Sequence, residues 1–147
     1  MSKTVHIASD HAGFALKRTV IEHLAKQGCA VQDHGAHSAQ SCDYPVYAQA
    51  LCRAVLAGGD LGILICGSGL GMSMMANRFQ GIRAAACTNE FLAAASRRHN
   101  NANVLCLGER VVGAGLALAI VDAFLQNDFE YGRHQNRIAM FDCNPDA

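Results

Sequence analysis

An apolar run that ends in a glycine-rich turn is the feature that most constrains this chain. Residues 63–65 are Ile-Leu-Ile, Cys66 follows, and glycines at positions 67, 69 and 71 precede a helix-like stretch over residues 72–79. A buried strand, a loop that exposes backbone N–H groups and the start of a helix together suit the binding of anionic oxygen. We therefore predict that the chemistry of this protein takes place at residues 66–71.

Strand and helix patterns alternate along the chain. Strand-like runs cover residues 4–8, 29–32, 61–66, 82–87 and 104–107, and helix-like segments cover residues 14–26, 45–57, 72–79, 90–98, 112–127 and, as a helix or turn, 133–141. This alternation predicts an α/β fold with a parallel sheet and helices on both of its faces. In such sheets ligands bind at the carboxyl ends of the strands, where the strand order switches.

The composition excludes several classes of protein. With 147 residues, 51% apolar and 16% charged, we expect one globular domain over residues 1–147. Twelve basic and twelve acidic residues cancel and Trp is absent, which argues against nucleic-acid and membrane-surface binding. Residues 1–9 contain no signal segment, and the apolar stretch over residues 111–125 is too short to cross a bilayer. Seven cysteines without a CxxC pair predict a reduced, cytoplasmic protein.

The glycine loop does not follow the common nucleotide-binding patterns. Its spacing is G-x-G-x-G after the third strand, rather than G-x-G-x-x-G after the first, and the lysine of a P-loop is missing. A tight turn would also explain the glycines, but we favour an anion cradle. Cys66 is either a small buried apolar residue or a base or nucleophile whose thiolate the helix N-terminus favours.

Other polar side chains have both structural and functional interpretations. Asp10 and His11 fit either a helix cap followed by a solvated histidine or a pair of ligands at a strand end. His99 fits a surface residue, or a group that moves protons beside a carbonyl substrate. Arg133 and Arg137, four residues apart, fit solvated charge or a phosphate site on one helical face.

A polar loop contains four possible metal ligands, His34, His37, Cys42 and Asp43. Their spacing matches no standard metal site, so we expect no metal there. We assign no function to His34 and His37, and solvated loop residues are the default interpretation.

Several short motifs, spread over essentially the whole chain, are specific when taken together. They are Ser9-Asp10-His11-Ala12-Gly13-Phe14, Asp43-Tyr44-Pro45, Ile65-Cys66-Gly67-Ser68-Gly69-Leu70-Gly71, Ala76-Asn77-Arg78, Gly81-Ile82-Arg83-Ala84, Arg98-His99-Asn100, Asn103-Val104-Leu105 and Gly132-Arg133-His134-Gln135-Asn136-Arg137. With these motifs the chain resembles the ribose-5-phosphate isomerase B family, part of a wider group that includes galactose-6-phosphate isomerase subunits.

The resemblance implies a Rossmann-like three-layer sandwich with a five-stranded parallel sheet. It also implies an aldose–ketose isomerase of the non-oxidative pentose phosphate pathway, which interconverts D-ribose 5-phosphate and D-ribulose 5-phosphate through a cis-enediolate. Neither a cofactor nor a metal is expected. The expected assembly is a homodimer, or possibly a tetramer, whose active sites lie between subunits.

The resemblance further implies functions for individual residues. Cys66 matches the general base, His99 matches the acid/base that opens the sugar ring, and Ser68 matches a hydroxyl beside the reacting oxygens. Relatives without this cysteine use a glutamate at the position of Met72, so Cys66 is the expected base here. The positions that match substrate-binding residues are Asp10, His11, Tyr44, Gly67, Gly69, Leu70, Gly71, Asn100, Arg110, Arg133, His134 and Arg137.

The resemblance also divides these residues by position. Asn100 and Arg110 match positions that the neighbouring subunit contributes, and Arg133, His134 and Arg137 match the phosphate end of the substrate.

Two other functions stay open at this point. The substrate could be a 6-phosphohexose, such as allose 6-phosphate or galactose 6-phosphate, although the Arg98-His99-Asn100 motif and the 132–137 segment favour the ribose enzyme. A phosphate- or nucleotide-binding module without turnover is the alternative from a different class, and it predicts an inert Cys66 and a dispensable His99.

Overall fold

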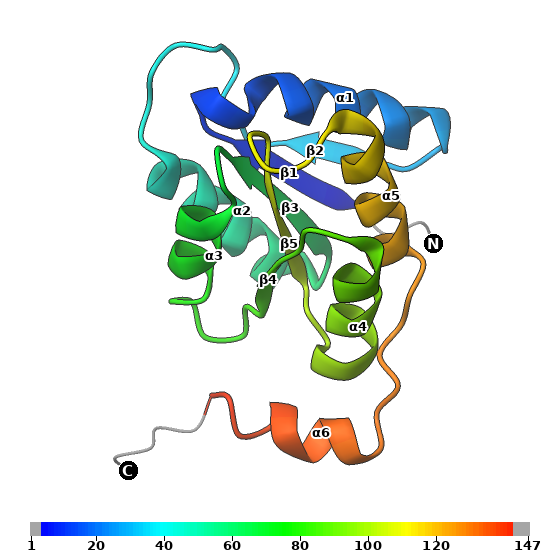
Figure 1. Ribbon diagram of the computed structural model, residues 1–147. Helices are drawn as coiled ribbons and strands as arrows, with labels where there is room; N and C mark the ends of the chain where they lie inside the picture. Colours follow the sequence, from blue (N-terminus) through cyan, green and yellow to red (C-terminus); the bar gives the residue numbers. More distant parts are fainter. Residues whose placement is uncertain (1–3, 143–147) are drawn as a thin grey trace.

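The computed structural model describes residues 4–142 and shows a parallel β-sheet between two layers of helices (Figure 1). All four pairs of neighbouring strands run parallel, in the order β2-β1-β3-β5-β4. The strands are β1 (Val5–Ser9), β2 (Val31–Asp33), β3 (Leu61–Cys66), β4 (Ala84–Ala86) and β5 (Val104–Gly108). The predicted five-stranded parallel sheet is therefore confirmed.

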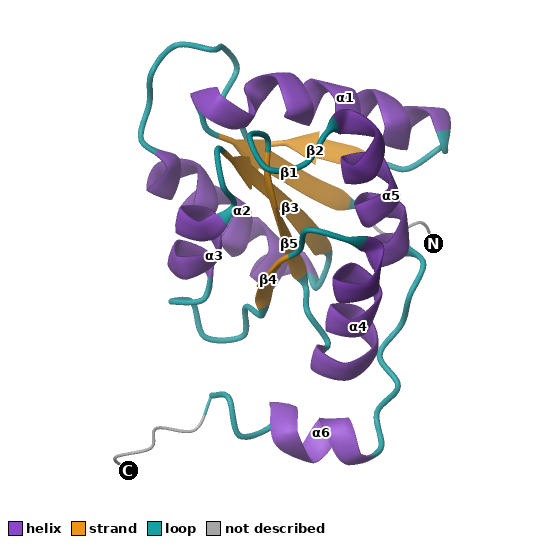
Figure 2. Ribbon diagram, in the orientation of Figure 1, coloured by secondary structure: helices purple, strands orange, loops and turns teal. Residues whose placement is uncertain are grey.

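The helices divide into two layers and one outlying segment. Their bounds are α1 (Phe14–Lys26), α2 (Tyr44–Gly58), α3 (Leu70–Ala76), α4 (Glu90–Asn100), α5 (Ala114–Leu125) and α6 (Arg133–Ile138), with a 3-10 turn η1 (His11–Gly13) before α1. Helices α1, α4 and α5 pack on one face of the sheet and α2 and α3 on the other (Figure 2). Helix α6 lies beyond the end of α4, away from the sheet, and has no buried residue. Within residues 4–142, no helix is both long enough and apolar enough to cross a membrane.

The strand side chains alternate between two apolar cores. On β3, Ile63 and Ile65 pack with α1 and α5, whereas Leu64 and Cys66 pack with α2 and α3. Every residue of β3 is buried, because helices cover both faces of the sheet. This double burial explains why the strand appears in the sequence as an uninterrupted apolar run.

The strand order switches at β1 and β3. The chain passes from β1 to β2 on one side, and then returns to place β3 on the other side of β1. Ser9, the last residue of β1, is in register with Ile65, one residue before the end of β3. The segments that follow these two strands therefore leave the sheet side by side, which is the geometry of a ligand site in open α/β sheets.

Some element boundaries differ from the prediction. The predicted strand over residues 82–87 shortens to β4, an edge strand that pairs only with β5. Strand β2 lies at 31–33 rather than 29–32, because the chain turns after α1 through Gly28. Helix α3 begins at Leu70 rather than at position 72, so the third glycine of the loop lies inside the helix.

Candidate active site

A pocket of about 390 Å³ lies at the carboxyl ends of β1, β3 and β5. Its lining residues come from the segments that follow these strands and from the start of α2. They are Asp10, His11, Ala12, Tyr44, Cys66, Gly67, Ser68, Gly71, Arg110 and Val111. The structure thus brings together eight of the predicted catalytic and substrate-binding residues: Asp10, His11, Tyr44, Cys66, Gly67, Ser68, Gly71 and Arg110.

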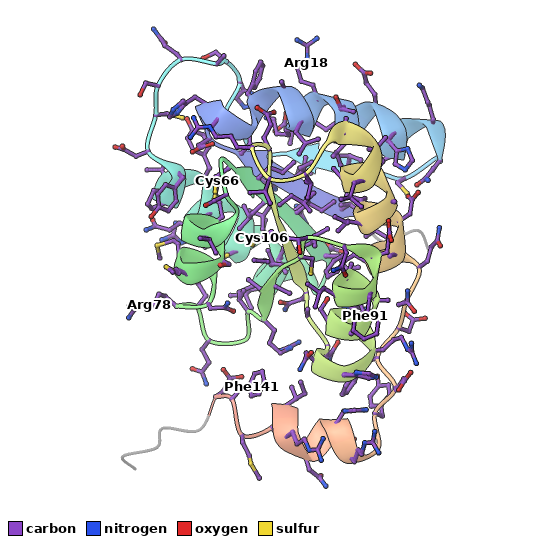
Figure 3. All side chains as sticks on the ribbon, in the orientation of Figure 1. Arg18, Cys66, Arg78, Phe91, Cys106 and Phe141 are labelled. Carbon is purple, nitrogen blue, oxygen red and sulfur yellow. The ribbon has the colours of Figure 1, made fainter. Side chains whose placement is uncertain are left out.

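Cys66 ends β3 and lines this pocket, and Figure 3 labels its side chain. The backbone N–H of Gly69 donates to Cys66 Sγ at 3.1 Å, an interaction that favours a negatively charged sulfur. Burial raises the pKa of the Cys52 thiol and of the Cys87 thiol to about 11. Burial also raises the pKa of Cys106 well above its ordinary value. All four cysteines are buried, and Cys66 is the one of them that lines the pocket.

Glycine is required at two positions of the loop. Gly69 has φ +81°, in the left-handed region, and its turn directs the N–H towards Cys66. A Cβ on Gly71 would come within 2.6 Å of Tyr44 Cζ, so this glycine lets the tyrosine ring lie over the start of α3. Leu70 follows the loop with a half-exposed side chain, and its N–H donates to Ser68 Oγ at 3.2 Å. Gly69 and Leu70 shape the loop without lining the pocket.

Asp10 is the predicted cap, His11 is half-buried rather than solvated, and both residues line the pocket. Asp10 Oδ1 accepts a hydrogen bond from the N–H of Gly13 at 3.1 Å, so Asp10 caps η1. His11 Nδ1 accepts from the backbone N–H of Cys42 at 3.2 Å. These bonds fix both side chains at the pocket wall, so the cap and the predicted ligand pair are compatible.

Arg110 lines the pocket of its own chain, whereas the resemblance led us to expect it from a neighbouring subunit. Its backbone N–H donates to Gly67 O at 3.0 Å, and a Cβ on Gly67 would lie 3.1 Å from its guanidinium. The preceding residue, Glu109, accepts a hydrogen bond from the N–H of Leu16 at 2.5 Å. The loop after β5 is thereby tied to the loop after β3 and to α1, an arrangement that no local sequence signal indicated.

The remaining predicted residues form a second group at α4 and α6. His99 and His134 stack with ring centroids 4.6 Å apart, and Arg133 and Arg137 lie on the same short helix as His134. Burial, His99 and Arg133 lower the pKa of His134, so this imidazole is neutral at neutral pH. None of these four residues lines the Cys66 pocket, and Asn100 lines a separate cleft of about 750 Å³. Helix α6 lies at the opposite end of the molecule from the loop that follows β3 (Figure 1).

Sequence reasoning missed Glu130, which belongs to this second group, as well as Ala12 and Val111 at the pocket wall. Glu130 lies in a stretch that the sequence marks only as a break between helices. Ala12 belongs to the motif over residues 9–14, but as a small apolar residue it does not indicate a site. Val111, an exposed valine, does not indicate one either.

One cluster in the described part of the chain has the donor atoms of a metal site. One nitrogen each of His99 and His134 and a carboxylate oxygen of Glu130 lie within 4.8 Å of one another. The two rings stack with their planes only 18° apart, so their in-plane lone pairs do not converge on one point between them. This arrangement fits a metal ion poorly. Two of the possible ligands in the polar loop that contains His34 and Cys42 have other partners. His34 Nε2 lies 2.8 Å from His6 Nδ1, and Cys42 Sγ lies 3.9 Å from His11 Nδ1.

Comparisons with known proteins place these features in a wider context. Residues 5–141 match the family described as Ribose/Galactose Isomerase. The chain is 49% identical over 138 residues to ribose-5-phosphate isomerase B of Escherichia coli (strain K12), covering 92% of each chain. It is 48% identical in sequence to a ribose 5-phosphate isomerase from Thermotoga maritima, and the two structures superpose with a TM-score of 0.94. The match to that crystal structure covers 97% of this chain and 99% of that one.

A further solved relative carries a ligand. Ribose-5-phosphate isomerase B from Mycoplasma genitalium, determined with bound ribulose-5-phosphate, is 44% identical and superposes with a TM-score of 0.93. The match covers 97% of this chain and 95% of that one.

Proposed function

Because the chain belongs to the ribose/galactose isomerase family, we propose that it interconverts D-ribose 5-phosphate and D-ribulose 5-phosphate. The observation that carries this proposal is the position of Cys66 Sγ, in a pocket and within 3.1 Å of a loop N–H. The names of the relatives from Escherichia coli and Mycoplasma genitalium support the choice of a five-carbon substrate.

The central step is a proton transfer between two neighbouring carbons. The Cys66 thiolate takes the proton from C2 of the open-chain aldose, and electrons from that bond form the C1–C2 double bond of a cis-enediolate. The negative charge then lies on the C1 oxygen. Cys66 returns a proton to C1, which gives the ketose without any change in the number of atoms or electrons.

The loop after β3 stabilises the charge that forms in this step. Backbone N–H groups of residues 67–71 are fixed by the β3–α3 turn before the substrate arrives, so no reorganisation is needed as charge develops. One such donor contributes on the order of 2.7–4 kcal/mol in other enzymes that stabilise an oxyanion. Ser68 lines the pocket, and we assign to its hydroxyl the transfer of a proton between the C1 and C2 oxygens.

Ring opening precedes this step, because ribose 5-phosphate is mostly cyclic in solution. We assign it to His99, which takes the proton of the anomeric hydroxyl while the C1–O4 bond breaks and O4 takes up a proton. In one chain His99 lies with the α6 group rather than at the Cys66 pocket. We therefore propose a homodimer in which the His99 group of one copy completes the Cys66 pocket of the other.

Arg133, His134 and Arg137 are the proposed phosphate site. Two cations four residues apart on one helix repel each other, and a phosphate dianion relieves that repulsion. The neutral His134 lies between the two arginines in the sequence and adds no third charge to the site. Holding the phosphate fixes the orientation of C1 and C2 at the other end of the substrate.

Arg137→Ala should therefore raise KM for ribose 5-phosphate by about 10- to 100-fold, the effect of losing one or two charge-assisted hydrogen bonds of about 1.5–3 kcal/mol in total. We expect a smaller change in kcat. Initial rates over a range of substrate concentrations measure this, with the exposed Arg18→Ala on α1 as the control. An unchanged KM would place the phosphate elsewhere.

The proposed function is tested by incubating the purified protein with ribose 5-phosphate and allose 6-phosphate in parallel and following ketose formation. We expect a higher kcat/KM for ribose 5-phosphate, and activity that survives treatment with chelator. Preference for allose 6-phosphate would assign a hexose substrate, and no turnover of either would favour the binding module.

The free cysteines of the described chain support a cytoplasmic location as part of this proposal.

A further inference from the structure

Glu130 joins the end of α4 to the segment that leads into α6. Its backbone N–H donates to Arg98 O at 3.0 Å, and its side-chain Oε1 accepts from Arg98 Nε at 2.6 Å. Two hydrogen bonds between the same pair of residues fix the position of the carboxylate relative to the last turn of α4. That turn also carries His99.

The second carboxylate oxygen faces two imidazoles. Glu130 Oε2 lies 3.7 Å from His99 Nε2 and 4.0 Å from His134 Nε2. The two rings stack on each other, so the carboxylate meets both rings on their Nε2 side. Glu130 is therefore the group that His99 and His134 share.

Neighbouring groups set the protonation states of Glu130 and His134. The hydrogen bond from Arg98 is the main reason why the pKa of Glu130 is lower than usual, so the carboxylate is ionised at neutral pH. The neighbouring His134 is neutral, as described above. An anion beside Nε2 of a neutral imidazole stabilises the tautomer that carries its proton there, which leaves the lone pair on Nδ1.

We propose that Glu130 is a positioning residue for ring opening: it holds the His99 ring and keeps its proton on Nε2, so that Nδ1 accepts the proton of the anomeric hydroxyl. This inference rests on the proposed function of His99. In the step itself the anomeric proton moves to Nδ1, the C1–O4 bond breaks as the C1 carbonyl forms, and O4 takes a proton from water. Glu130 touches neither the substrate nor the reacting atoms.

The chemistry of the two substrates separates this step from the proton transfer at Cys66. Ribose 5-phosphate closes a five-membered ring through its C4 hydroxyl, so its conversion needs ring opening. Ribulose 5-phosphate has its carbonyl at C2 and its C5 oxygen bonded to phosphate, so no hydroxyl can close such a ring. Exchange of its C1 proton with solvent therefore needs Cys66 but not ring opening.

The test compares Glu130→Gln with the wild type in both reactions. We expect kcat for ribose 5-phosphate to fall by about 10- to 100-fold, the usual effect of removing a carboxylate that orients a functional histidine. We expect exchange of the C1 proton of ribulose 5-phosphate with D₂O to stay at the wild-type rate. Glu90→Gln, the same chemical change at the exposed start of α4, should leave both reactions unchanged.

The other outcomes overturn the inference in distinguishable ways. Equal losses in both reactions would mean that Glu130 only supports the fold, and no loss in either would mean that it has no function in ring opening. A wild-type protein inactive in both assays would refute the proposed function itself. If Glu130→Gln does not fold, Glu130→Asp, which keeps the charge but shortens the side chain, is measured in the same two assays with the same expected split.

Discussion

Replacing Cys66 with alanine should lower kcat for ribose 5-phosphate by about 10³-fold, within the range of 10²–10⁴ that a general base contributes. The cause is local, because Cys66 Sγ is the proposed proton acceptor and Cys66 lines the pocket. Binding of the substrate should be retained, because the residues proposed to bind its phosphate lie on α6 and are unchanged. Initial rates and equilibrium binding of ribulose 5-phosphate measure the two properties separately.

Cys29→Ala is the matched control for this substitution. Cys29 is also a free thiol, but it lies in the turn before β2 and does not line the Cys66 pocket. Wild-type kinetics are expected for Cys29→Ala. A Cys66→Ala variant that still turns over ribose 5-phosphate at the wild-type rate would remove Cys66 from the mechanism.

Mixing two inactive variants should restore activity. If each active site takes Cys66 from one copy and His99 from the other, a dimer of Cys66→Ala with His99→Ala has one complete site and one that lacks both groups. Random pairing of equal amounts makes half of the dimers mixed, so about a quarter of the wild-type activity is expected after subunit exchange. Rates measured before and after co-refolding of the two variants test this.

The control mixes Cys66→Ala with a chain that carries both substitutions, which cannot form a complete site. Native mass spectrometry shows whether the mixed dimers have formed. Mixed dimers that stay inactive would mean that the two groups of residues act separately, and a single chain would then have to close on itself to bring His99 to Cys66.

The fold was predictable where burial leaves a clear pattern. Strand β3 and helix α1 have the predicted bounds, because β3 is buried along its whole length and α1 turns a periodic apolar face to the sheet. Strand β4 was overestimated mainly at its start, because Ile82 packs into the core beneath α2 and α3 without pairing with β5, whereas Cys87 keeps one backbone hydrogen bond to Cys106. Apolar character reports burial, and at an edge strand burial continues beyond the hydrogen-bonded pairs.

The site was predictable only as far as its chemistry is local in sequence. The glycine loop and Cys66 are adjacent in the sequence, and the function proposed for them depends on the turn that they form. Glu130 is different, because it meets Arg98 across 32 positions of sequence and nothing in its own segment indicates a histidine nearby. Arg110 similarly reaches Gly67 through the pairing of β3 with β5, which sequence periodicity does not specify.

The role of Cys66 as the base is tested most directly by following ribose 5-phosphate by NMR in D₂O with wild-type protein and with Cys66→Ala. We expect the wild type to form ribulose 5-phosphate with deuterium at C1, because the proton held by Cys66 exchanges with solvent before it returns. The variant should form neither the product nor the label at a comparable rate. If both proteins formed ribulose 5-phosphate equally well, with the original C2 proton fully retained at C1, Cys66 would not be the base.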